Sequence, residues 1–169
     1  MGRLDEIEVL VQTCRAMARR VSDRLESYHQ QLTESASTHL LVGVDVCLCE
    51  CAASAVGCVS LYESRLKKTF GWAVPFKELQ EWLSQNNQSA LALEVELLVM
   101  AINVLKHGEG RSLSTLQNFA GKLPFDLHLG DGEFDVCFQP ELISVGPDFV
   151  EYCADLIERT WKEVQQQAS

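Results

Sequence analysis

Positive charge is scarce in this sequence. Lysine and arginine number 14 against 24 aspartates and glutamates, so the formal net charge is −10. General binding to nucleic-acid backbones needs clustered lysine and arginine, and the composition therefore excludes a broad nucleic-acid binder while leaving room for a local basic pocket. With 47% hydrophobic and 22% charged residues the composition is typical of a soluble globular protein, and 169 residues predict a single domain over residues 1–169.

A secretory signal and an uninterrupted membrane span are also missing. The N-terminal residues carry charges of both signs and lead directly into an amphipathic pattern. The two most apolar segments, Leu40–Leu61 and Ala90–Leu105, each contain two acidic residues. Each such charge costs about 2.5–3.5 kcal/mol at the centre of a bilayer. We therefore expect two buried core helices and no membrane association.

An even cysteine count, which a complete set of disulfides would need, is lacking as well, because the cysteines number seven. Free thiols suit a reducing compartment, so a cytoplasmic location is predicted. The string Cys47-x-Cys49-x-Cys51 has the wrong spacing for a metal site, since side chains two residues apart on a helix point in different directions. Cys47, Cys51 and Cys58 are instead expected to share one face as small buried residues.

The common motifs of cofactor and nucleophile sites do not occur. There is no Walker-type loop, no dinucleotide fingerprint and no Gly-x-Ser-x-Gly elbow, so no cofactor is predicted. Glu26 and His29 have half of the motif used by carboxylate-bridged di-iron bundles, which need a second copy and further glutamates. Only one copy is present. A di-metal bundle enzyme is therefore the weakest alternative, and no metal site is predicted.

Apolar residues recur at steps of three and four through most of the chain, which predicts amphipathic helices. We expect helices over residues 3–32, 39–68, 75–84, 90–106 and 148–166. A short helix is expected to begin near Ser114, because Ser114-x-x-Gln117 has the spacing of a capping box, and Ser89 is expected to cap the helix that follows it. The segment 39–68 is apolar nearly all the way round, which is typical of a central helix.

The segment 126–138 departs from the helical pattern. Apolar and polar residues alternate on both sides of a Gly-Asp-Gly turn, which predicts a small β-hairpin. The predicted fold is thus all-α, an up-down bundle of four to six helices with this hairpin inserted before the last helix. Its long apolar stripes fit a homodimer as well as a monomer.

One run, where a long apolar helix ends and a new helix begins, combines several polar and basic groups with glycines. An amide, an imidazole, two cations and two glycines fall within ten residues. Such a junction exposes backbone N–H groups and lets glycine adopt conformations closed to other residues, so it suits an anion or phosphate. The predicted ligand-binding residues are Asn103, Lys106, Gly108, Gly110, Arg111 and Ser112, and the predicted catalytic residue is His107.

Two interpretations of this run remain open. In the functional one, Lys106 and Arg111 hold a phosphate, His107 is placed to transfer a proton, and a carboxylate of an apolar helix, Asp45 or Glu94, faces this end of the helix. In the structural one, the cations complement the helix dipole and the glycines end the helix.

The run Asn103-Val-Leu-Lys-His107, late on a long helix that follows up-down helices, resembles the HEPN superfamily over residues 3–111. Several members are ribonucleases or nucleotide-modifying partners in toxin–antitoxin and antiviral systems. They commonly act as dimers with a composite Arg-x4-6-His site. The resemblance implies binding of a nucleotide or RNA phosphate. The chain departs from the motif, because no arginine stands five to seven residues before His107 and the only Arg-x4-His is Arg24 to His29.

The negative charge supports a different interpretation, a non-enzymatic protein-interaction module. Its acidic surface would bind a basic protein partner. The Lys106–Arg111 run would then be a well-capped helix junction, and substitution of His107 would change stability without changing partner binding.

Overall fold

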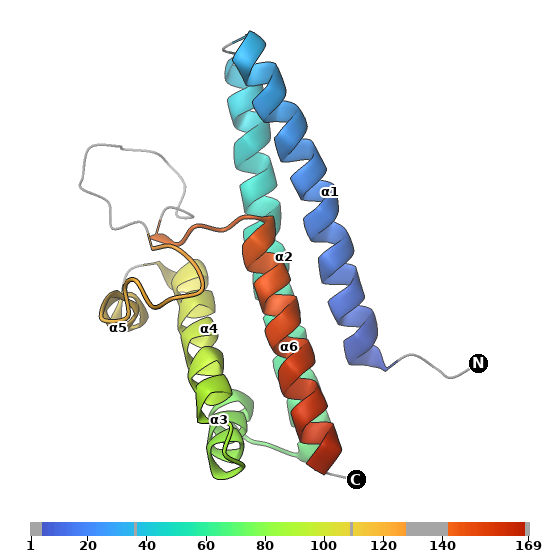
Figure 1. The fold of residues 1–169 in the computed structure, drawn as a ribbon, viewed down its shortest axis with the longest axis vertical. Coiled ribbons are helices and arrows are strands. Elements are labelled where there is room, and N and C mark those ends of the chain that lie inside the picture. The colour runs from blue at the N-terminus through green and yellow to red at the C-terminus, as the bar shows by residue number, and fades with distance from the viewer. Residues whose placement is uncertain (1–4, 36, 109, 128–141, 168–169) are drawn as a thin grey trace.

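The computed structural model describes residues 5–35, 37–108, 110–127 and 142–167. Its first five helices are joined by connections of three or four residues, and a longer segment separates the fifth from the last (Figure 1). They are α1 Glu6–Glu34, α2 Thr38–Phe70, α3 Pro75–Gln85, α4 Ser89–His107, α5 Arg111–Gln117 and α6 Pro147–Gln167. The all-α prediction is confirmed, and each of the five long helices begins and ends within three residues of its predicted bounds.

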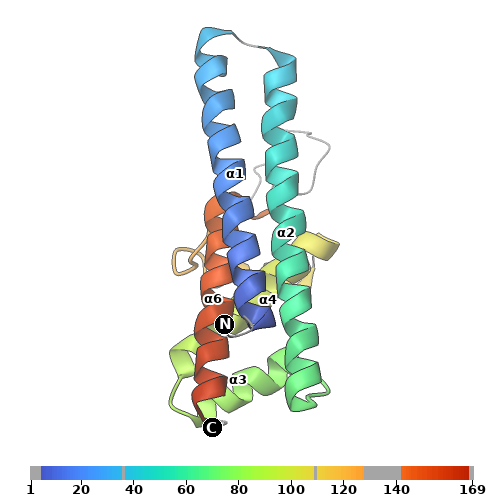
Figure 2. The same cartoon turned by 90° about the vertical axis from the view of Figure 1, so that its right-hand side faces the viewer.

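The two longest helices, α1 and α2, form an antiparallel αα-hairpin, and α6 packs along the lower part of both (Figures 1 and 2). The inner face of α1 is an apolar stripe with the predicted helical spacing. Its buried members are Ile7, Val11, Cys14, Ala18 and Val21. Beyond Val21 the hairpin extends past the beginning of α6, so its tip consists of two helices only (Figure 2).

The inner face of α2 carries the predicted buried cysteines. Cys47 and Cys51 are fully buried and Cys58 is 2% exposed, which confirms that the three share one face. Further along this face, the hydroxyl of Tyr62 lies 2.8 Å from Oγ1 of Thr160 on α6. Thr160 is itself fully buried and donates to a backbone carbonyl of its own helix. Because a buried hydroxyl without a partner costs about 1–3 kcal/mol, this pair favours one register of α6 on α2.

The remaining helices cover the opposite side of α2 and α6. Helix α4 packs against α3 and α5 and also contacts α2 and α6, while α3 crosses below them (Figure 2). Leu79 and Leu83 attach α3 to the core, and Leu113 and Leu116 attach α5. All six helices thus contribute to one cluster of buried apolar residues.

The predicted β-hairpin is not borne out. Most of it, residues 128–138, lies outside the described residues. The described residues contain one isolated antiparallel bridge, between Leu127 and Ile143, beside a 2.9 Å hydrogen bond from Ser144 N to Asp126 O. Ile143 is fully buried and Val145 nearly so. Burial of these two residues therefore favours this pairing. The segment that pairs with Leu127 lies after residue 138, where the predicted hairpin ended.

Two helix starts differ from the predicted ones. Helix α5 begins at Arg111, and Ser114 lies inside it, where its hydroxyl donates to the carbonyl of Gly110 at 3.3 Å. Ser89 is the first residue of α4, after Gln88, and gives no side-chain cap. Docking of Leu113 and Leu116 on α4 needs helix before Ser114, so tertiary packing decides the start of α5 over the local capping signal.

The expectation that α2 is buried on all sides is wrong for its outer side. Leu41, Val42 and Val46 are 55%, 52% and 45% exposed. By length and composition α2 is the one described helix apolar enough to cross a membrane, and only 22% of its most apolar window is buried. The helix is therefore covered on one face and left apolar on the other.

Two glycines of α2 test how closely the hairpin helices approach. A Cβ on Gly43 would lie 2.7 Å from Cζ of Tyr28, whereas a Cβ on Gly57 would meet nothing within 4 Å. Alanine stabilises a helix interior by about 0.5–1 kcal/mol relative to glycine. We expect Gly57→Ala to raise the melting temperature. Gly43→Ala is expected to lower it, because displacing a packed ring costs about 1–3 kcal/mol.

Thermal unfolding followed by circular dichroism measures both effects. Equal stabilisation by the two substitutions would mean that the Tyr28 ring moves aside freely and does not hold the hairpin together.

Candidate functional site

The predicted site lies at the junction of α4 and α5. Helix α4 ends at His107, and Gly108 follows in the left-handed region (φ 72°) with its N–H donating to the carbonyl of Val104 at 2.7 Å. A side chain is strained in that conformation, which explains the glycine at this position. Helix α5 begins three residues later, so only a short turn separates the two helices.

The junction brings the predicted cations to one exposed turn. Lys106, His107 and Arg111 are exposed, and none of them forms an ion pair or side-chain hydrogen bond with a described residue. Asn103 and Ser112 are half-buried beside them. Gly108 is buried and Gly110 exposed. The arrangement concentrates positive charge next to a helix C-terminus, where Lys106 and His107 also complement the helix dipole.

Of the two carboxylates considered for this site, Glu94 is held elsewhere by an arginine. Glu94 accepts hydrogen bonds from Arg159 of α6, one of them at 3.2 Å from Nη1. It lies twelve residues before Lys106, which is about 18 Å along α4. Asp45 is exposed on α2 and forms no ion pair with any described residue. The idea that Glu94 faces the Lys106–His107 end is wrong, because Arg159 holds its carboxylate elsewhere.

The motifs on the first helix are not assembled into a site. Arg24 donates to Glu50 of α2 at 2.6 Å, whereas Glu26 and His29 are exposed. An exposed ion pair of this kind contributes about 0–1 kcal/mol to stability. In the described part of the chain, no group of three His, Cys, Asp or Glu side chains is placed to hold a metal ion.

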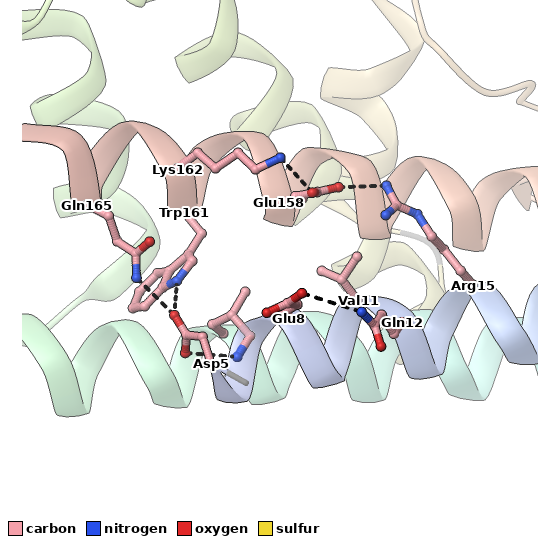
Figure 3. Close-up of a pocket in the computed structure, with 10 residues that line it drawn as sticks. Asp5, Glu8, Val11, Gln12, Arg15, Glu158, Trp161, Lys162 and Gln165 are labelled. Atoms are coloured by element: carbon pink, nitrogen blue, oxygen red, sulfur yellow. Dashed lines mark hydrogen bonds and ion pairs between the residues drawn. The ribbon is translucent and has the colours of Figure 1, made fainter. Parts of the chain in front are cut away.

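A cavity of about 350 Å³ between α1 and α6 was not anticipated from the sequence (Figure 3). At one end of it, Asp5 caps α1 by accepting from the N–H of Ile7 at 3.2 Å. Its other carboxylate oxygen accepts from Nε1 of Trp161 at 2.6 Å and from Nε2 of Gln165 at 2.9 Å. The combination of Asp5 with Glu8 three residues later, just before an apolar stripe, is a capping signal that could have indicated this role.

At the other end of the cavity Glu158 accepts from Arg15 at 2.8 Å and from Lys162 at 2.6 Å (Figure 3). These contacts from Lys162 and Arg15 lower the pKa of Glu158. Burial raises the pKa of Asp5, but the hydrogen bonds from Trp161, Ile7 and Gln165 outweigh it, so the pKa lies below its usual value. The two carboxylates are thus satisfied by the protein itself. Their contacts hold α1 and α6 together, and both carboxylates already have hydrogen-bond partners within the protein.

Asp5→Asn tests this connection, since asparagine keeps the cap and removes the charge. A carboxyl with a lowered folded-state pKa stabilises the fold above its unfolded-state pKa, about 3.9, and the effect is lost as pH falls through the folded-state value. We expect the wild type to be more stable than the variant at pH 7, and the two stabilities to converge at about pH 3 and below.

Urea unfolding at a series of pH values provides the measurement, with Glu8→Gln as the control. Glu8 lies on the same cavity and forms no ion pair with a described residue. A gap between wild type and Asp5→Asn that does not change with pH would show that the Asp5 charge makes no contribution.

Comparison with known proteins returns no match for this chain among protein-family models, curated proteins or solved structures. Any assignment of function therefore depends on the arrangement of the chain's own residues.

Proposed function

We propose that the protein binds a phosphate-bearing ligand, a nucleotide or RNA, at the junction of α4 and α5. The observation that carries the proposal is the group of cations there without an internal partner. Elsewhere on the helical surfaces, most lysines and arginines are neutralised by the chain's own carboxylates. The ion-paired ones are Arg15, Arg24, Arg65, Lys77, Arg159 and Lys162.

The geometry suits a small anion better than an extended strand. Lys106 and Arg111 flank a turn of four residues and can contact one phosphate group together. Arginine binds phosphate through two parallel N–H groups, and lysine contributes a compact charge. The likeness of Asn103–His107 to HEPN domains supports the same ligand class. In this proposal His107 is the acid–base group of any reaction, and Asn103 orients it or the ligand.

The surrounding charge limits the affinity and its dependence on salt. The net charge of −10 disfavours the approach of a polyanion to the chain as a whole. Two phosphate contacts give a slope of about −1.4 for the logarithm of the binding constant against the logarithm of salt with single strands. A much steeper slope would indicate a larger basic surface than the junction provides.

The test compares two pairs of exposed cations. Lys106→Ala with Arg111→Ala removes the junction pair. Lys67→Ala with Lys68→Ala removes another pair, also at a helix C-terminus and without an ion pair. We expect the first double variant to weaken binding of a labelled 12-nucleotide RNA at least tenfold and the second to change it less than twofold, as measured by fluorescence anisotropy at low salt.

Competition by ATP and by inorganic phosphate identifies which part of the ligand is bound.

The His107→Ala variant is expected to bind the RNA with a Kd within about threefold of the wild-type value and to lose any cleavage of the bound RNA. Equal losses for the two cation pairs, or no binding by the wild type at low salt, would refute the proposal and leave the junction as a helix end.

A further inference from the structure

The outer face of α2 carries no charged side chain over about five helical turns, roughly 27 Å. Its residues follow one another at steps of three and four, on the side opposite the buried cysteines. They are Val42, Val46, Cys49, Ala53, Gly57 and Ser60. Val42 and Val46 are about half exposed, and Ala53 is exposed as well. This surface is far more apolar than a solvated helix face needs to be.

The reason for the exposure is visible in the packing. Helices α1 and α6 cover the inner face of α2, and α6 has 21 residues against 33 in α2 (Figures 1 and 2). Leu40, Cys47 and Cys51 of the inner face are buried, while their neighbours on the outer face are not. Folding of the described residues therefore leaves this face without cover.

The two edges of the outer face differ in charge. Asp45 and Glu63 are 18 residues apart, which is five turns, so they lie on the same edge. Neither forms an ion pair with a described residue. On the other edge, Glu50 is paired with Arg24 of α1 at 2.6 Å. Helix α2 contains no lysine or arginine before Arg65. One edge thus offers two carboxylates without counter-ions, and the other adjoins α1.

Charge decides among the occupants that could cover such a face. A second copy that paired over the stretch from Val42 to Ser60 would bring the same carboxylates and no lysine or arginine, so it would neutralise neither Asp45 nor Glu63. A bilayer would have to accept both carboxylates at the border of its hydrocarbon. A helix with lysine or arginine along one edge satisfies the apolar face and the two charges at once.

We propose that the outer face of α2 docks an amphipathic helix of a partner protein, with an apolar stripe about five turns long and lysine or arginine along one edge. The small residues Cys49, Ala53 and Gly57 let the partner backbone approach closely. The larger apolar side chains of the partner helix then pack between the two valines, Val42 and Val46, and the small residues. This surface is separate from the α4–α5 junction and does not depend on the function proposed there.

The probe is a synthetic 22-residue helical peptide with leucines at steps of three and four and lysines along one edge of that stripe. Its binding to the full chain is measured by isothermal titration calorimetry. Val46→Lys places a cation beside Val42 in the N-terminal part of the proposed surface. Val9→Lys is the matched control, because Val9 of α1 is 46% exposed and Val46 is 45% exposed. We expect at least a tenfold increase in Kd for Val46→Lys and less than twofold for Val9→Lys.

Charge reversal tests the chemistry of the edge. The double variant Asp45→Lys with Glu63→Lys is expected not to bind the lysine peptide. It is expected to bind a peptide in which glutamate replaces each lysine. Circular dichroism establishes that all variants are folded. Equal binding of both peptides by the reversed variant would overturn the electrostatic part of the proposal. So would equal binding of a peptide of the same composition in scrambled order.

Two further measurements separate the other occupants. Sedimentation equilibrium of the wild type and Val46→Lys reports self-association, and co-sedimentation with phosphatidylcholine vesicles reports lipid binding. Self-association or vesicle binding that Val46→Lys abolishes would assign the face to a second copy or to lipid and overturn the proposal. The proposal is supported if the wild type is monomeric, does not sediment with vesicles, and binds the lysine peptide with a Kd that Val46→Lys raises at least tenfold.

Discussion

Contact of one face of α2 with both α1 and α6 is the constraint on which the rest of the structure depends. The two helices of a hairpin do not bury their apolar faces completely against each other. Helix α6 packs on both of them and completes the burial. Tyr62 and Thr160 meet inside this three-helix contact, where Thr160 is the hydrogen-bond partner of the Tyr62 hydroxyl. Asp5 and Trp161 then join the beginning of α1 to the end of α6. Segments separated by most of the chain are therefore held in one register.

The same constraint explains the two surfaces that the fold leaves unused. Helix α6 is shorter than the hairpin and packs on the inner side of α2, so no described helix covers the tip or the outer face of α2. On the other side, α4 is anchored by its contacts with α3 and α5, and its C-terminal end points its basic residues outward. The two surfaces differ in chemistry, one apolar with a carboxylate edge and the other cationic.

Internal ion pairing sharpens this contrast. Arg15 contacts three carboxylates of α6, and Arg159 is held by Glu94 of α4. Such pairs add little stability singly, but they neutralise the cations that take part in them. Lys106 and Arg111 form no ion pair with a described residue, and α5 itself contains no acidic residue. An acidic protein can thus present a local basic site, which composition alone could only leave open.

The sequence by itself determined the helices, since a period of three to four apolar residues depends on local geometry alone. The buried stripe of α1 and the shared face of Cys47, Cys51 and Cys58 were predicted in this way and are confirmed. It also identified the junction as a helix end with basic residues. Periodicity could not tell which side of the uniformly apolar α2 would be covered. Nor could it pair Leu127 with Ile143, or Asp5 with Trp161. Those choices depend on which distant segments pack together, and only the tertiary structure decides them, because their energies come from contacts between residues far apart in the chain.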